Sequence, residues 1–149
     1  MQNVLNQNDY DRLLQRLDML SADAHRLWGS MHVEAMLWHL RAQLELALGQ
    51  RKTNTSINSY LKLSPFRWLA LYIIPWPKGS ATAPEMNVKR AQPELLSFEA
   101  EKQMLIACLQ QIGNTENLQP HPLFGRLSKK DWGRLIWKHV DHHLRQFCV

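Results

Sequence analysis

Four stretches of this chain carry apolar residues at helical spacing, and turn-forming residues interrupt the sequence between them. The first stretch covers about residues 8–20, and charged residues separate its apolar positions. The second covers about residues 31–48, with Ser30 as the expected N-cap and Gly49 as the expected stop. The pattern therefore predicts an all-α protein whose helices bury their apolar faces against one another.

The third and fourth helices are predicted from their end signals as well as from their spacing. Pro93 suits the first position of the third helix, where its missing N–H costs nothing, and Gly113 ends it. Ser128 precedes Asp131 by three positions, which is the arrangement wanted at the start of a fourth helix over about 129–146. The apolar stripe of the third helix is Phe98, Leu105, Leu109 and Ile112.

The stretch over about 50–92, between the second and third predicted helices, is long and irregular, and such excursions in small proteins are often functional. Its apolar piece, Phe66 to Trp76, contains Arg67 and is bounded by Pro65 and Pro75. It falls short of the ~20 residues that a bilayer span needs, so we expect no membrane partner. We interpret it as a buried helix, with two equal alternatives for its role, a lid over a pocket or a homodimer surface.

The length of 149 residues is enough for a single domain over residues 1–149 with its own core. Cys108 and Cys148 show no paired spacing, and the first residues lack an apolar leader, so a cytoplasmic location is expected. We assign Cys108 to the core. The net charge of +5 comes from scattered Lys and Arg residues and not from a basic helix face, so we expect no nucleic-acid partner.

Three histidines fall on the apolar faces of the second and fourth predicted helices. On an ideal helix His143 lies at ~40° and Trp132 at ~20° from His139, within the apolar face. The same geometry places His39 on the inward face of the second helix. Histidines from two facing helices can therefore converge.

An i,i+4 histidine pair is a recurrent metal-ligand spacing, because consecutive turns present both imidazoles to one point. His139 and His143 form such a pair, and His39 can supply a third ligand from the facing helix. Three imidazoles leave an open coordination position, as catalytic zinc sites do. Imidazole suits both zinc and nickel, and the sequence does not choose between them. The alternatives are core histidines satisfied by hydrogen bonds, or a solvated cluster near the C-terminus.

The remaining histidines receive no role in this interpretation. His32 lies ~10 Å from His39 along the helix axis, too far to share an ion, and is interpreted as a pocket-wall or first-turn surface residue. His25 falls in a connection, and His121 stands beside two prolines. The carboxylates nearest the triad in sequence point away from it, which argues against a hydrolytic base. They are Glu34, Glu45 and Asp141.

Two segments of the sequence, WGSMHVEAMLWHL and HPLFGRLSKKDWGRLIWKHVDHHLRQF, resemble the DinB/YfiT-like superfamily. The resemblance covers most of the chain and is closest to an uncharacterised branch. It implies a four-helix bundle in up-down-down-up order, with a long connection between helices 2 and 3. It also implies a metal triad of His39, His139 and His143, with His142 as the alternative in register for either member of the pair.

Characterised relatives in that superfamily use low-molecular-weight thiols, such as bacillithiol or mycothiol, in S-transfer or isomerisation. The resemblance thus implies a metal-dependent, thiol-dependent S-transferase, in which the metal lowers the pKa of a thiol and a small-molecule substrate supplies the electrophile. Two alternatives stay open. One is a metal-dependent hydrolase, and the other is a non-catalytic metal-binding or interaction bundle.

Overall fold

The computed structural model describes residues 1–53, 59–80 and 82–149. Regular structure within these residues is helical, and the β contact found there is an isolated bridge between His121 and Gly125. The predicted all-α class is therefore confirmed. No helix in the described part of the chain is both long and apolar enough to cross a membrane.

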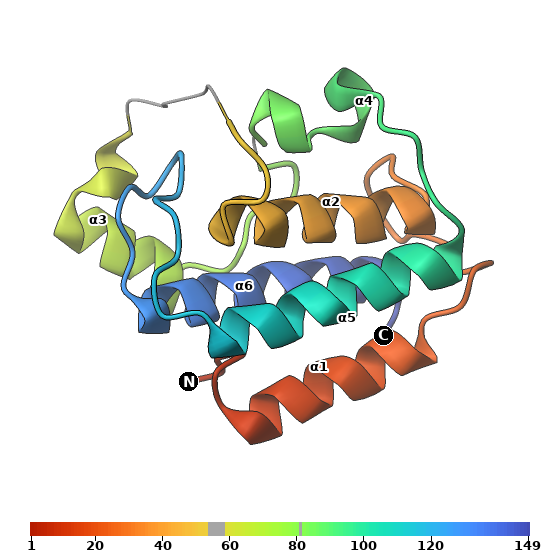
Figure 1. The fold of residues 1–149 in the computed structure, drawn as a ribbon, viewed down its shortest axis with the longest axis horizontal. Helices are drawn as coiled ribbons and strands as arrows, with labels where there is room; N and C mark the ends of the chain where they lie inside the picture. The colour runs from red at the N-terminus through yellow and green to blue at the C-terminus, as the bar shows by residue number, and fades with distance from the viewer. Residues whose placement is uncertain (54–58, 81) are drawn as a thin grey trace.

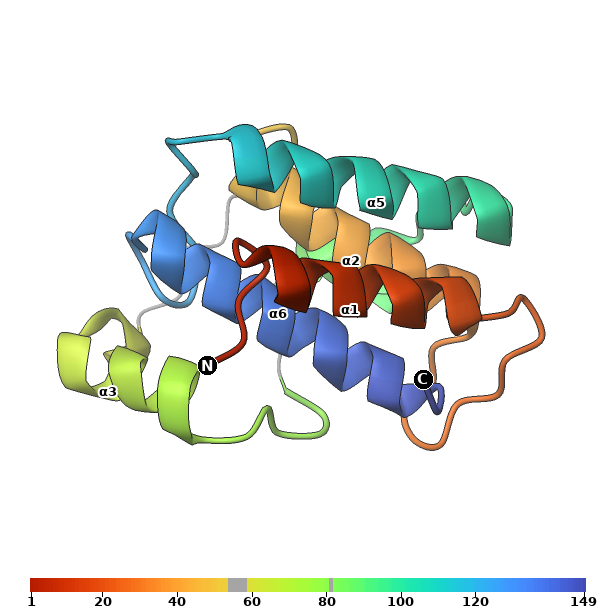
Figure 2. The same cartoon turned by 90° about the horizontal axis from the view of Figure 1, so that it is seen from below.

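Four long helices form the body of the molecule: α1 (Gln7–Met19), α2 (Val33–Ala47), α5 (Phe98–Asn114) and α6 (Lys129–Gln146). Figure 1 shows α1 and α6 running in one direction and α2 and α5 in the opposite direction. Helix α2 packs against α5 and α6, and α1 packs against α6, as Figure 2 shows from below. The core between them contains Leu13, Leu17, Met36, Leu40, Leu105, Leu109, Trp132 and Leu135.

Helix α2 begins later than the predicted N-cap at Ser30. Its N-cap is His32, which makes no side-chain capping bond, and the carbonyl of His32 accepts the first helical hydrogen bond. The preceding residues are committed elsewhere, because the amide of Leu27 and the carbonyl of Trp28 both bond to Gln146 of α6. The predicted stop is confirmed, since Gly49 follows the helix with a φ of 76°, which glycine adopts without strain.

Helix α5 also begins later than predicted, at Phe98 and not at Pro93. Ser97 is its N-cap, with its hydroxyl accepting from the amide of Ala100, and Glu99 and Glu101 lie in the first turn. A capping hydroxyl followed by carboxylates outweighs the preference of proline for a helix start. The α6 start is confirmed, since the Ser128 side chain accepts from the amide of Asp131. The predicted α5 stripe is buried.

The predicted connection over 50–92 contains several short helical pieces, and residues 54–58 and 81 of it lie outside the described residues. A 3-10 turn η1 (Tyr60–Lys62) leads into α3 (Ser64–Trp68), which continues as a π-helical turn η2 (Leu69–Ile73). Of these pieces η2 packs against α6, whereas η3 (Pro84–Met86) contacts α2 and α4 (Val88–Ala91) packs on η3, above α2 in the view of Figure 1.

The apolar segment Phe66 to Trp76 is largely exposed, which corrects the prediction of a buried helix. Leu71 is 1% exposed and packs into the core, but Phe66, Trp68 and Ile73 are 50–55% exposed. The prediction was wrong because only one face of this short helix reaches α6. The lid and homodimer interpretations remain predictions.

The first turn of α6 receives the N-terminal residues in close contact. The amide of Val4 donates to the carbonyl of Gly133 at 3.2 Å. A methyl group on Gly133 would collide with the side chains of Asn3 and Leu5, the Leu5 Cγ lying 2.8 Å from its position. Glycine therefore lets the N-terminal segment lie directly on the backbone of α6.

Candidate metal centre

His39 of α2 and the pair His139 and His143 of α6 converge on one point in the protein interior. The Nε2 atom of His139 lies 3.1 Å from Nε2 of His39 and 3.1 Å from Nε2 of His143. All three side chains are buried, and their candidate ligand atoms lie within 4.8 Å of one another. The three histidines singled out from the sequence therefore form a group that could hold a metal ion.

The outward nitrogen of each imidazole faces an oxygen atom. Nδ1 of His39 lies 2.8 Å from the carbonyl oxygen of Met86, and Nδ1 of His143 lies 2.9 Å from Oε1 of Gln146. Nδ1 of His139 contacts Oε1 of Gln43. An oxygen partner requires each Nδ1 to carry the proton, which leaves each Nε2 with a free lone pair. Metal-ligating histidines have this kind of outer partner.

The orientation of the Gln146 amide is fixed by a second hydrogen bond. Its Nε2 donates to the carbonyl oxygen of Trp28 at 2.6 Å. A carbonyl cannot donate, so the amide nitrogen faces Trp28 and the amide oxygen faces His143. The proton of His143 is thereby placed on Nδ1.

Burial keeps the three rings uncharged. Desolvation lowers the pKa of His39, and it lowers the pKa of His143 to about 3. The pKa of His139 is lowered well below its usual value, first by desolvation and then by the neighbouring histidines. At neutral pH three lone pairs therefore face one another without a proton between them. That arrangement is unfavourable by itself and favourable around a cation.

His142 lies next to this group without belonging to it. Its ring is tilted by 86° against that of His143, with the ring centroids 5.1 Å apart, and it is half-buried beside Trp28 and Trp76. The group of candidate ligands consists of the other three histidines. His32 is exposed and contacts Glu34, so the surface interpretation of His32 is the one the structure supports.

His121, to which the sequence interpretation gave no role, is buried and caps a turn. Its Nδ1 accepts hydrogen bonds from the backbone amides of Leu123 and Phe124, at 3.1 and 3.3 Å. Desolvation lowers its pKa to about 4. Its neighbouring prolines gave no signal of this, because the capping bonds form within a turn and not on a helix face.

Two pockets of about 300 Å³ each adjoin the histidine group, and Trp76 lines both. Its ring stacks on that of His139 with the centroids 5.0 Å apart. One pocket is apolar, and its wall includes Leu61, Ile74 and Phe124. The other is more polar, and its wall includes Ser30, Asn87, Lys89, His142 and Gln146.

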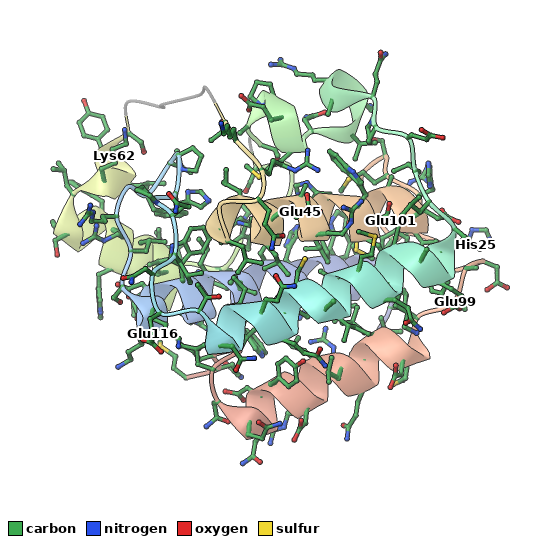
Figure 3. The ribbon with its side chains drawn as sticks, in the orientation of Figure 1. His25, Glu45, Lys62, Glu99, Glu101 and Glu116 are labelled. Atoms are coloured by element: carbon green, nitrogen blue, oxygen red, sulfur yellow. The ribbon has the colours of Figure 1, made fainter. Side chains whose placement is uncertain are left out.

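The carboxylates that the sequence analysis weighed are engaged away from the site. Glu45 pairs with Arg41 and Arg51, and Figure 3 shows it with Glu101 where α2 and α5 meet. The fully buried carboxylate of Glu101 accepts a hydrogen bond from Nε of Arg41 at 2.8 Å. Asp141 pairs with Arg16 and Arg145. The predicted core position of Cys108 is confirmed, since the residue is buried and desolvation raises the pKa of its thiol. Neither of the two pockets has Asp or Glu among its described wall residues.

Sequence reasoning missed the partners of the imidazoles. Gln43 lies at ~40° from His39 on α2, and Gln146 lies at ~20° from His139 on α6. An amide side chain on a histidine-bearing apolar face was therefore a usable signal. Met86 and Trp76 belong to the irregular connection, where no periodicity could have pointed to them.

A family model described as "Protein of unknown function (DUF1569)" matches residues 2–148 of the chain. No curated protein and no solved structure gives a significant match. Neither finding assigns an activity to the chain.

Proposed function

The chain belongs to the DUF1569 family of unknown function, and we propose that it is a metal-dependent enzyme whose cation is held by His39, His139 and His143. The observation that carries this proposal is the convergence of three buried Nε2 atoms whose rings each present the other nitrogen to an oxygen. Zinc and nickel are the metals that we propose, because imidazole nitrogen suits both.

Two of the three nitrogen separations fit a metal ion, and all the candidate ligand atoms lie within 4.8 Å of one another. Imidazole nitrogens bound at ~2.0–2.1 Å to a tetrahedral ion lie roughly 3.3 Å apart. The two separations of 3.1 Å, from His139 to His39 and from His139 to His143, are close to that value. A buried, uncharged and pre-oriented donor set of this kind needs little rearrangement to receive a cation.

We further propose that the chain is one DinB-like domain with a four-helix bundle in up-down-down-up order. Two features support this. The directions of the four long helices in Figure 1 agree with that order, and the long connection between α2 and α5 lies where the superfamily has one. The likeness to the superfamily rests on the residues quoted from the sequence.

The reaction that we propose is thiol-dependent S-transfer. The thiol would lose its proton to solvent, its sulfur would form a bond to an electrophilic carbon of a small substrate, and a leaving group would depart from that carbon with its bonding electrons. A divalent cation supplies Lewis acidity, which favours the thiolate form of a thiol at neutral pH. The chain's own residues contribute positioning, since Trp76 covers the ring of His139 and lines both of the pockets that reach the histidines. Two adjoining pockets suit a reaction that joins two molecules.

Metal-dependent hydrolysis is the second candidate, and the pocket walls support it less well. Activation of water at such a site usually employs a nearby carboxylate, and the described walls of both pockets lack one. The non-catalytic alternative assigns the metal a structural role, but two pockets beside the histidines favour a site that admits substrate.

Elemental analysis of protein purified without a histidine tag tests the metal site. We expect about one equivalent of metal in the wild type and a large loss in His39→Ala and in His143→Ala. His32→Ala is the matched control, because His32 is an exposed histidine at the start of the same helix as His39. Absence of metal from wild type, even after zinc and nickel are offered, would refute the proposal.

Activity assays then separate the reaction classes. S-transfer predicts metal-dependent consumption of a thiol in the presence of an aromatic electrophile, and no turnover in His143→Ala. Turnover of esters without thiol would instead support hydrolysis. A large fall in melting temperature on chelation, with neither activity, would indicate a structural metal.

A further inference from the structure

Exposed apolar side chains gather on one short segment of the chain. Thirteen large apolar side chains are exposed among the described residues, and seven of them lie between residues 60 and 74. We call these seven the apolar patch: Tyr60, Leu63, Phe66, Trp68, Leu69, Ile73 and Ile74. A cluster of this size on a folded protein usually marks an interaction surface.

The segment that carries the apolar patch is firmly attached to α6. Leu71 is buried in the core, and its carbonyl oxygen accepts from Nε of Arg134 at 3.1 Å. Lys138 donates to the carbonyl oxygens of Ala70 and Ile74, and the Tyr72 hydroxyl lies 2.7 Å from Asp131. These contacts fix the inner face of the segment to α6, so the side chains of the apolar patch remain on its outer face.

The charge around the apolar patch has one sign in the sequence. Residues 51–84 contain no Asp or Glu, and they contain Arg51, Lys52, Lys62, Arg67 and Lys78. Lys62 and Arg67 lie within the segment that carries the apolar patch, whereas Arg51 pairs with Glu45 and Lys78 lies over the ring of Trp28. Exposed Trp, Phe, Leu and Ile side chains in a basic, acid-free segment are the composition of elements that lie in the interface of anionic membranes.

The apolar pocket beside the histidines shares wall residues with this segment. Its wall includes Ala70 and Ile74 from the segment, and His39 and His139 from the site. Ile74 belongs both to the apolar patch and to the pocket wall. One pocket wall thus joins residues of the exposed segment to two of the imidazoles.

We propose that the apolar patch is a peripheral membrane-binding surface for bilayers that contain anionic lipid. It places the apolar pocket against the bilayer, so the electrophilic substrate is a lipid-soluble molecule that enters from the membrane. The substrate part of this inference rests on the proposed function, whereas the membrane part does not. The expectation of no membrane partner rested on the lack of a bilayer span, which a surface-bound protein does not need.

A second copy of the chain is the competing occupant, and the charges disfavour it. A two-fold dimer brings each patch against the same patch of its partner. The segment contains basic residues and no acidic ones, so its charges would meet like charges across that interface. An anionic bilayer offers the opposite sign.

Vesicle flotation tests the membrane surface with the metal-loaded protein. Vesicles of phosphatidylcholine with about one quarter phosphatidylglycerol should bind wild type at least about tenfold more strongly than pure phosphatidylcholine, and high salt should weaken the binding. The double variant Phe66→Ser/Trp68→Ser should lose most of it. The double variant Met19→Ser/Leu27→Ser removes two even more exposed apolar side chains elsewhere and should bind like wild type.

Binding to neither type of vesicle, or unchanged binding of Phe66→Ser/Trp68→Ser, would overturn the proposal. So would a wild-type dimer in light scattering that this variant converts to monomer, because the patch would then belong to a second copy. The comparison of the two lipids uses wild type alone, so it stands even if a variant misfolds. Metal content separates the metal-site proposal from the membrane proposal. His39→Ala should lose metal and keep vesicle binding, whereas Phe66→Ser/Trp68→Ser should keep metal and lose vesicle binding.

Discussion

The carbonyl oxygen of Trp28 accepts a hydrogen bond from Nε2 of Gln146 at 2.6 Å, and this bond turns the amide oxygen of Gln146 toward His143. A backbone carbonyl in the connection before α2 thus determines that Nδ1, and not Nε2, carries the proton of the His143 ring on α6. The same connection passes the end of α6, where the amide of Leu27 donates to the carbonyl of Gln146.

Gln146→Leu should weaken metal binding without removing a ligand. The ring of His143 loses the acceptor for its Nδ1 proton, and loss of an outer partner of this kind lowers metal affinity roughly 10–100-fold. Competition with a chromogenic chelator measures the change. Gln15→Leu, on the exposed face of α1, is the control and should leave the affinity as it is. Equal affinities for the two variants would contradict the role given to Gln146.

Removal of metal should lower the melting temperature. A ligand at about a hundred times its Kd that binds only the folded state adds ~2.7 kcal/mol, which for a chain of this size corresponds to roughly 5–10 °C. Differential scanning fluorimetry with and without chelator measures the shift. His39→Ala should show no response to chelator, and an equal response in both proteins would place the metal elsewhere.

His121 should make the fold sensitive to acid. Its pKa is lowered to about 4 in the folded chain, so the unfolded chain takes up the proton first as the pH falls below ~6.5. The contribution of His121 to the free energy of unfolding is fully present above pH ~6.5. It is lost as the pH falls from there to about 4, which lowers the free energy of unfolding by about 3 kcal/mol. Urea unfolding in chelator at several pH values, for wild type and His121→Asn, isolates this effect. Parallel curves for the two proteins would exclude it.

Gly133→Ala should destabilise the protein by ~1–3 kcal/mol, because the added methyl group meets the side chains of Asn3 and Leu5. Gly113→Ala is the matched control within another helix. No atom lies within 4 Å of its added methyl group, so it should be neutral or stabilising by up to ~1 kcal/mol. Urea denaturation measures the change in the free energy of unfolding for each variant. Similar changes in both would show that Asn3 and Leu5 do not lie in close contact with Gly133.

Arg41→Met should destabilise the protein by ~3–5 kcal/mol, because it leaves the fully buried carboxylate of Glu101 without its cation. Arg12→Met removes the exposed cation near Asp9 and should cost less than ~0.5 kcal/mol. The same denaturation measurement serves for both. A small effect at Arg41 would mean that water reaches Glu101 in the variant.

The predictable part of the fold was determined by local chemistry. Ser128 and Asp131 are three residues apart and act within one turn, so the start of α6 could be predicted to the residue. The start of α2 could not, because the residues before it bond to Gln146, which is more than a hundred positions away. The start of α5 follows the same local rule through Ser97, although Pro93 was the residue predicted to begin the helix.

The site divides in the same way. Helical periodicity places His39, His139 and His143 on inward faces, and the structure brings them together. The acceptor for His39 is the carbonyl of Met86 in η3, within a segment that has no periodicity to interpret. The stacking of Trp76 on His139 likewise depends on how that segment folds back over α6.

Lys138 and His139 are neighbours on α6, and they connect the exposed segment to the site at two points. Lys138 binds the carbonyls at the end of η2, and the ring of His139 lies under Trp76, just beyond η2. The turn of α6 that anchors the exposed segment is therefore also the turn that carries a candidate metal ligand.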